Sequence, residues 1–184
     1  DNKVKFFKTH HINCKIGQYS FTSKKNTLAT IYIIRDPRNL VNSISNHFSK
    51  SIEDSKNFLF APKIITKFEK EDDLENKSLI TLLGTWNEHY NFWKNNNENF
   101  LLIKYEDLIN NTNSELDKII AFIKRFTPIQ TDEIKNKNII KTTSFNYLQN
   151  LEEKGGFDEN AYDTNDTKKK FFNLGPKNNW ENNL

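Results

Sequence analysis

The sequence predicts an α/β protein with a mostly parallel sheet flanked by helices. Two short apolar runs, residues 30–35 and 100–104, have the length and β-branched or bulky content of buried strands. Each run passes at once into an apolar pattern of helical period. Strands that alternate with helical segments are typical of βαβ units, which form parallel sheets.

The first elements follow from short local patterns. Residues 4–8 (Val-Lys-Phe-Phe-Lys) read as a short strand, and a polar loop then extends to about residue 28. After the strand at residues 30–35, a helix is expected over residues 37–49. Asp36 is suited to cap this helix, and Pro37 stands at the first helical position, where proline is tolerated. The apolar stripe of this helix is Leu40, Val41, Ile44 and Phe48.

The remaining elements complete a single domain over residues 1–184. Residues 51–75 are mixed in character, with a short helix expected near residues 63–69. Apolar residues at helical spacing, from Leu79 through Leu82, Leu83, Trp86 and Tyr90 to Trp93, predict one long helix. Further helices are expected over residues 114–126 and 144–154, the latter ending at Gly155-Gly156.

Composition narrows the possible functions. The chain has 184 residues, 35% of them hydrophobic, and its 15 Phe supply much of the apolar area for a core. One cysteine, Cys14, excludes an internal disulfide framework and fits a reducing, cytoplasmic compartment. Four His without C-x-x-C spacing give no sign of a zinc site, and no apolar run has the length of a membrane span. The mixed charge, +3 overall, suits small anionic ligands and gives no support for a nucleic-acid groove.

Arg35 and Ser43 form a candidate anion site. Arg35 ends a strand, and Ser43 lies two helical turns after Asp36 on the flank of the apolar stripe. A guanidinium and a hydroxyl at the start of a helix are suited to one phosphate. Spacing alone allows an equal alternative, in which Arg35 pairs with Asp36 or a nearby Glu and Ser43 has no binding role.

Lys8 and His10 form a second candidate pair. A histidine beside a lysine at the end of a strand can act as general base next to a cation that stabilises developing negative charge. A partly exposed loop histidine is the alternative, and the adjacent His11 leaves the choice open.

Five segments, taken in order, resemble the sulfotransferases that use 3′-phosphoadenosine-5′-phosphosulfate (PAPS). They are Lys8-Thr-His10, Ile31-Tyr-Ile-Ile-Arg-Asp-Pro-Arg with Ser43, Leu102-Ile-Lys-Tyr-Glu-Asp-Leu108, Thr142-Thr-Ser-Phe145, and Phe171-Phe-Asn-Leu-Gly175 followed by Trp180. Each segment is weak by itself, but the ordered set covers nearly the whole chain. The resemblance implies the P-loop-NTPase-like, three-layer sulfotransferase fold.

The resemblance also implies roles for individual residues. His10 would take the proton from a hydroxyl or amine acceptor, and Lys8 would help to hold the sulfuryl group. The acceptor would be a small molecule or a glycan, PAPS the donor, 3′,5′-adenosine bisphosphate (PAP) the product, and no metal would be required. The residues that would bind the nucleotide are Arg35 and Ser43 at the 3′-phosphate, Tyr105, Thr143 and Phe145 around the adenine, and Asn173 and Gly175 in the C-terminal loop.

Two departures from the family pattern qualify this interpretation. The family's strand–loop–helix that holds the 5′-phosphosulfate is absent from this sequence. Because the chain contains no Met and starts at Asp1, we interpret it as an N-terminally truncated fragment, which we expect to be inactive alone. Asn173-Leu174 replaces the usual Arg-Lys, and Lys177 is a possible substitute. These departures favour, as the alternative function, a non-catalytic nucleotide-binding or interaction module of the same fold. A nucleotide kinase of related architecture fits the Lys8-Thr-His10 and Thr143-Ser-Phe145 segments less well.

Overall fold

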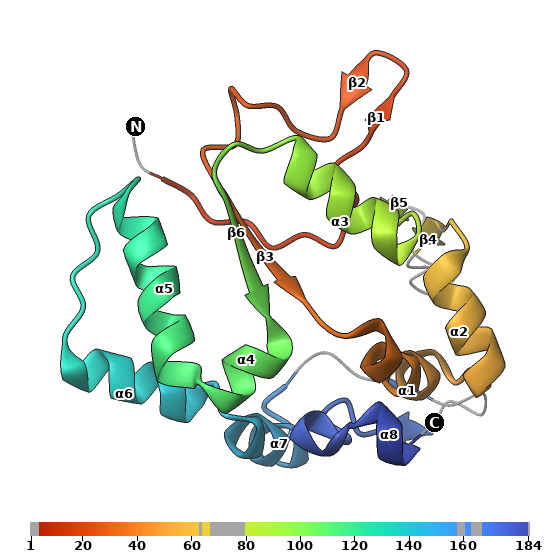
Figure 1. Ribbon diagram of the computed structural model, residues 1–184. Coiled ribbons are helices and arrows are strands. Elements are labelled where there is room, and N and C mark those ends of the chain that lie inside the picture. Colours follow the sequence, from red (N-terminus) through yellow and green to blue (C-terminus); the bar gives the residue numbers. More distant parts are fainter. Residues whose placement is uncertain (1–3, 63, 67–79, 158–160, 163–166, 184) are drawn as a thin grey trace. The chain divides into compact units, whose positions relative to one another are not determined.

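A computed structural model describes residues 4–62, 64–66, 80–157, 161–162 and 167–183 (Figure 1). Strands and helices alternate along the chain, as the sequence predicts for an α/β protein. The strands are β1 (Lys15–Ile16), β2 (Tyr19–Ser20), β3 (Thr30–Ile34), β4 (Ile64–Thr66), β5 (Ile80–Leu82), β6 (Phe100–Lys104), β7 (Ala161–Tyr162) and β8 (Lys168–Lys169). The helices are α1 (Pro37–Phe48), α2 (Ile52–Phe60), α3 (Trp86–Asn95), α4 (Tyr105–Asn110), α5 (Thr112–Lys124), α6 (Glu133–Thr142), α7 (Phe145–Glu153), the 3₁₀ turn η1 (Gly175–Lys177) and α8 (Trp180–Asn183).

The strands β3 and β6 are hydrogen-bonded neighbours and run in the same direction (Figure 1). Parallel neighbours require a long crossover, and here residues 35–99 connect the two strands. Ile103 of β6 is completely buried, whereas the adjacent Leu102 is exposed. The prediction of these two strands and of their parallel arrangement is therefore confirmed.

Helix α1 begins where the sequence predicts. The Asp36 carboxylate accepts a hydrogen bond from the backbone N–H of Arg38 (2.9 Å), and Pro37 occupies the first turn. Val41 and Ile44 are buried on its inner face. Helix α7 likewise starts after the cap Ser144 and ends before Gly155, whose positive φ of 74° suits the residue that follows a helix.

The described chain divides into two compact units. The first contains residues 1–32 and 58–101, and the second contains residues 33–57 and 102–184. The division passes through β3 and β6, so each strand contributes residues to both units.

In the first unit, helix α3 packs against the segment that follows His10. The buried Trp93 donates from its indole N–H to the backbone carbonyl of His11 (3.0 Å), and the backbone N–H of Ile12 donates to the carbonyl of Leu82 (2.7 Å). The ring of Phe21 stacks on His11 with centroids 4.4 Å apart. These contacts fix the backbone around residues 10–12.

In the second unit, helix α1 contacts the C-terminal segment. The side chain of Asn46 donates to the carbonyl of Lys170 (2.9 Å), and Lys169 donates back to the carbonyl of Asn46 (3.2 Å). The buried Asn178 donates to the carbonyl of Asn39 (2.7 Å). Residues near the end of the chain therefore pack along a helix that lies near its beginning.

Three predicted elements are wrong in part. Residues 4–8 are not a strand, since within the described ranges no neighbouring strand pairs with them. The long helix predicted from Leu79 begins only at Trp86: Gly84 adopts a φ of 66°, and Thr85 forms a capping box with Glu88. A helix was predicted near residues 63–69, but residues 64–66 form the strand β4 and the other residues of this range lie outside the described residues. Leu79, the first residue of the predicted long helix, also lies outside the described residues.

The errors at residues 63–69 and 79–85 share a cause. Leu82 belongs to β5, which pairs antiparallel with β4, so tertiary pairing overrides an apolar spacing that also fits a helix. Four helices were missed, α2, α4, α6 and α8. For α2 and α6 the N-terminal caps could have indicated the helix: Ser51 accepts from the backbone N–H of Asp54 (3.0 Å), and Asp132 accepts from that of Lys135 (2.7 Å).

Candidate functional site

Arg35 and Ser43 lie together in the second unit. Strand β3 ends at Ile34, so Arg35 leaves the sheet where α1 begins, and Ser43 follows on that helix. Arg35 Nη1 donates to Ser43 Oγ at 3.1 Å. Asp36 instead pairs with Arg38 (2.6 Å), so the alternative in which Asp36 neutralises Arg35 does not hold.

The other contacts of Arg35 form a partly buried cation site. Its Nη2 donates to the backbone carbonyl of Gly175 (3.3 Å), and its guanidinium lies 4.4 Å from the centre of the Tyr105 ring. Burial lowers the pKa of Arg35, opposed by the nearby Tyr105 and Glu106, and the group stays charged at any physiological pH. Arg35 Nε is buried and has no hydrogen-bond partner among the described residues. A buried, unused donor on a cation is what an anionic ligand would satisfy.

A set of asparagines supports Ser43. Asn178 Nδ2 donates to Ser43 Oγ (3.3 Å) as well as to the carbonyl of Asn39, and Asn42 Nδ2 donates to Asn178 Oδ1 (3.3 Å). Ser43 Oγ thus accepts from both Arg35 and Asn178. Its own hydroxyl hydrogen is left to donate to a further acceptor.

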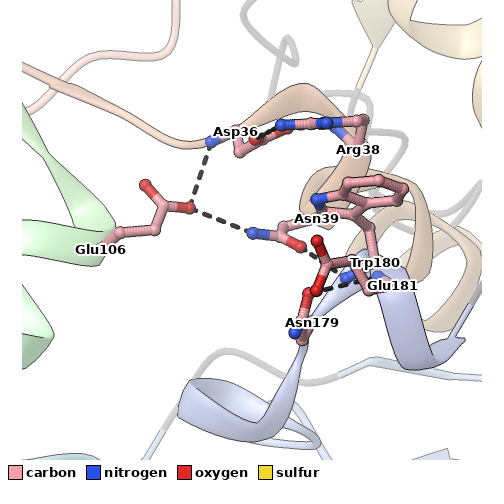
Figure 2. A network of polar contacts seen from close by, with 7 residues as sticks. All are labelled: Asp36, Arg38, Asn39, Glu106, Asn179, Trp180 and Glu181. Carbon is pink, nitrogen blue, oxygen red and sulfur yellow. Dashed lines mark hydrogen bonds and ion pairs between the residues drawn. The ribbon is translucent and has the colours of Figure 1, made fainter.

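Figure 2 shows the polar network beside this site. Glu106 Oε1 accepts from the backbone N–H of Asp36 (3.2 Å) and from Asn39 Nδ2 (3.3 Å), which fixes the turn that carries Arg35. Asn39 Oδ1 accepts from the backbone N–H of Trp180 (2.9 Å). Glu106 therefore has a structural role, and the C-terminal segment is held by the same network.

Trp180 is held by a second contact. The Arg38 guanidinium lies 4.2 Å from the centre of the Trp180 ring, while Arg38 remains paired with Asp36. Nearby, the backbone N–H of Glu181 donates to Asn179 Oδ1 (3.2 Å), as Figure 2 shows. The start of α8 is thereby fixed against the start of α1.

Gly175 and Phe145 are in direct contact. Gly175 has a φ of 51°, a left-handed conformation that favours glycine, and any Cβ there would overlap the Phe145 ring. Phe145 begins α7 and packs edge-on against Phe172, with ring centroids 6.1 Å apart. Arg35, Gly175 and Phe145 thus form a continuous set of contacts.

Helix α7 also holds the segment before Gly175. The buried Glu152 accepts from the backbone N–H groups of Phe171 (2.6 Å) and Phe172 (3.0 Å). Gln149 Nε2 donates to the carbonyl of Phe172 (2.9 Å). Phe157 packs on both phenylalanine rings, with centroids 5.1 and 4.8 Å away. One helix therefore fixes the backbone of the C-terminal loop and also carries Phe145.

Two predicted site residues lie outside this contact set. Thr143 is exposed at the end of α6 and donates to the carbonyl of Ile139 (2.7 Å). The Asn173 side chain is exposed, and its backbone N–H donates a hydrogen bond to the carbonyl of Phe171 (3.0 Å). Leu174 is half-buried, and Lys177 is exposed at the end of η1.

Lys8 and His10 belong to the first unit and are both exposed. The His10 backbone carbonyl lies 3.2 Å from His89 Nε2, and His89 Nδ1 lies 2.8 Å from the Tyr32 hydroxyl. Burial lowers the pKa of His89, and burial together with Tyr90 raises the pKa of Tyr32 to about 12. Both groups are therefore neutral near pH 7.

Sequence reasoning missed Asn39, Asn178 and Glu152. Buried asparagines and glutamates are unusual, but in a chain rich in Asn and Lys nothing local distinguishes these from exposed ones. One feature of the sequence could have indicated a role for Asn178: it lies between Gly175 and Trp180, two residues of the family pattern. Within the described ranges, no cluster of three His, Cys, Asp or Glu side chains could hold a metal ion, and no helix combines the length and apolar character needed to cross a membrane.

Comparisons with known proteins show the family to which the chain belongs. A family model of the sulfotransferase domain matches residues 1–184. The chain is 31% identical over 147 residues to the 3-alpha-hydroxysteroid sulfotransferase of Cavia porcellus, covering 78% of this chain and 46% of that protein. It is 29% identical to the 3-beta-hydroxysteroid sulfotransferase of the same species, with the same coverage.

A solved structure shares the fold. The crystal structure of mouse sulfotransferase SULT7A1 complexed with PAP aligns with a TM-score of 0.53 and 19% identity, covering 85% of this chain and 53% of that one. The chain thus spans about half the length of the relatives that it matches.

Proposed function

The chain belongs to the family of sulfotransferase domains and has their α/β fold, and on that premise we propose that the whole protein transfers a sulfuryl group from PAPS to a hydroxyl or amine acceptor. The observation that carries the proposal is the partly buried Arg35, hydrogen-bonded to Ser43 and Gly175 with its Nε unused. An adenine nucleotide with a 3′-phosphate is the anion that this family brings to such a site.

The 3′-phosphate would bind at Arg35 and Ser43. The unused Nε–H of Arg35 and the hydroxyl hydrogen of Ser43 are two donors suited to phosphate oxygens. Both side chains are already held in place, so little side-chain entropy is lost when a ligand binds. Gly175, whose carbonyl accepts from Arg35, would let the backbone of the C-terminal loop come close to the same phosphate.

The adenine would lie among Tyr105, Thr143 and Phe145. The Tyr105 ring already stacks on the Arg35 guanidinium, and Phe145 is held against Gly175. Asn173 would donate one hydrogen bond to the nucleotide from the C-terminal loop. Because Leu174 has no donor, Arg35 and Ser43 would supply most of the affinity for the 3′-phosphate.

His10 and Lys8 would act at the acceptor. His10 would remove the proton from the acceptor hydroxyl or amine as that atom forms its bond to sulfur. The bond from sulfur to the phosphate oxygen would break in the same step, and Lys8 would stabilise the charge that develops there. When bound, PAPS supplies the sulfuryl group and leaves as PAP, and no metal takes part in the proposed step.

The acceptor is proposed to be a small molecule or a glycan. The hydroxysteroid relatives favour a small-molecule hydroxyl. The 5′-phosphosulfate would need a loop that residues 1–184 do not contain, so this chain alone is expected to be inactive. With a single cysteine, the protein is proposed to work in the cytoplasm as one sulfotransferase domain.

Calorimetry with PAP and with 5′-AMP tests the nucleotide site. Wild type is expected to bind PAP more tightly than 5′-AMP, and Ser43→Ala and Arg35→Lys should each reduce that preference. Because hydrogen bonds to charged groups contribute about 1.5–3 kcal/mol, the loss for each variant should be about 10- to 100-fold in PAP affinity. The matched control is Ser114→Ala, which removes an exposed hydroxyl from α5. Equal affinity of wild type for the two nucleotides would reject the 3′-phosphate site.

A non-catalytic nucleotide-binding module is the second candidate, favoured by Asn173-Leu174 in place of Arg-Lys. The full-length protein separates the two functions. A sulfotransferase should transfer labelled sulfate to a hydroxysteroid or phenol panel, and His10→Ala should abolish turnover while PAP binding persists. PAP binding without turnover in the wild type would favour the module instead.

A further inference from the structure

Helix α3 holds the backbone of the segment that carries His10. His89 and Trp93 lie one helical turn apart on one face, and each contacts a successive backbone carbonyl. Trp93 Nε1 donates to the carbonyl of His11 at 3.0 Å, and His89 Nε2 lies 3.2 Å from the carbonyl of His10. The His10 side chain is exposed, so its direction depends on how its backbone is held.

The chemistry of the partners fixes the direction of each hydrogen bond. A carbonyl oxygen only accepts, so His89 Nε2 must carry a hydrogen and donate to His10. In the neutral ring Nδ1 is then an acceptor, and the Tyr32 hydroxyl, 2.8 Å away, must be its donor. The hydrogen bonds therefore run from Tyr32 to His89 and from His89 to His10.

Tyr32 is itself held by its neighbours. Its ring packs against Tyr90 and Phe100, with centroids 5.8 and 5.7 Å away. The partial burial that raises the pKa of Tyr32 keeps its hydroxyl protonated, and the burial of His89 favours the neutral ring. The pKa of His89 is lowered first by burial and then by the neighbouring imidazoles of His10 and His11, and the hydrogen bond to the His10 carbonyl opposes this shift.

We propose that Tyr32 and His89 are positioning residues for His10. Tyr32 fixes the tautomer of His89, and His89 fixes the His10 carbonyl, which limits the backbone rotation that would turn the His10 imidazole away from an acceptor. The importance of this arrangement for turnover rests on the proposed role of His10 as acceptor base. The hydrogen-bond arrangement itself is independent of that role.

Two variants of His89 separate positioning from packing. In His89→Gln the side-chain amide reaches the place of Nε2 and keeps a donor to His10. In His89→Asn the shorter amide reaches only the place of Nδ1, so the partner of Tyr32 is kept and the donor to His10 is lost. Tyr32→Phe keeps the ring and removes only the hydroxyl.

Kinetics of the full-length protein give the first test. His89→Asn is expected to lower kcat by about 10- to 100-fold, because small misplacements of a reacting group have effects of that size. His89→Gln should retain most of kcat, Tyr32→Phe should be intermediate, and the KM for PAPS should not change in any of them. Equal losses in the Gln and Asn variants would overturn the proposal, since a packing role predicts that result.

NMR of the histidine rings gives a second test that needs no turnover. Nitrogen shifts of His89 in the full-length protein should show the neutral ring with hydrogen on Nε2. The His10 ring should give a single ordered set of signals in wild type and in His89→Gln, and averaged signals in His89→Asn. Hydrogen on Nδ1 of His89, or an ordered His10 ring in the Asn variant, would overturn the proposal even if the protein transferred no sulfate.

Discussion

Replacing Gly175 by alanine should lower the stability of the second unit and weaken the proposed nucleotide site. The added methyl group would overlap the Cε2, Cδ2 and Cζ atoms of Phe145, and the backbone φ of 51° is unfavourable for any residue with a Cβ. Gly155 offers a matched control, because its φ of 74° is also left-handed but a Cβ there meets nothing within 4 Å.

The two variants separate backbone strain from ring displacement. A left-handed alanine costs about 1–2 kcal/mol, and this is the whole effect expected for Gly155→Ala. Gly175→Ala should cost about 1–3 kcal/mol more, which is typical of overpacking. The Phe145 ring cannot move without disturbing Phe172, which packs against Phe157 at 4.8 Å between ring centroids.

Urea unfolding of both variants measures the difference, with the slope of the free energy against urea unchanged from wild type. Calorimetry with PAP then reports on the site: affinity should fall in Gly175→Ala, where Phe145 is displaced, and remain unchanged in Gly155→Ala. Equal losses of unfolding free energy in the two variants would refute the contact between Gly175 and Phe145. A destabilised Gly175→Ala with wild-type PAP affinity would instead place the adenine away from Phe145.

The remaining predictions concern three other side chains. Glu152→Ala removes the acceptor of two backbone N–H groups, so it should lower the unfolding free energy by about 2–3 kcal/mol and weaken PAP binding. Glu152→Gln keeps an acceptor oxygen and should lose less stability. An Ala variant as stable as wild type in urea would contradict this prediction. Burial lowers the pKa of His89 in the folded protein, so the stability contributed by the neutral ring is complete above the unfolded-state pKa of 6.5 and is lost as the pH falls below it. The unfolding free energy should therefore decrease more steeply between pH 7 and 5 in wild type than in His89→Gln. Parallel curves for the two proteins would argue against a buried neutral ring. Thr85→Ala breaks the capping box of α3 and should cost about 1 kcal/mol by thermal unfolding, and no change in Tm would mean that the cap does not hold the helix in solution.

The sequence was most informative where neighbours in the chain determine the structure. Asp36 and Pro37 start α1, and the spacing from Arg35 to Ser43 is set by helical geometry, so both the helix and the Arg35–Ser43 contact were predictable. The sequence did not show whether Arg35 is left available for a ligand or pairs with Asp36. That outcome depends on which of two cations, Arg35 or Arg38, pairs with the Asp36 carboxylate, and in the structure it is Arg38.

Contacts between distant segments were beyond prediction. Asn39 meets Asn178 and Trp180 across about 140 residues, and an asparagine carries no periodic signal that reveals such a partner. The strand β5 was not predicted for a related reason. Leu82 fits the apolar spacing of a helix, and only the pairing with β4 makes this segment a strand. The roles of Lys8 and His10 in the first unit stay predictions.

The C-terminal residues that complete the Arg35 site determine when the site can exist. Gly175, Asn178 and Trp180 contact Arg35, Ser43 and Asn39 over separations of 135 to 141 residues. At a synthesis rate of about 5–20 residues per second, the ribosome needs on the order of ten seconds between making the two sides. Until then the partly buried guanidinium lacks its carbonyl partner. A nascent or C-terminally clipped chain is thus unable to complete the Arg35 site, so the proposed nucleotide binding depends on residues 175–180.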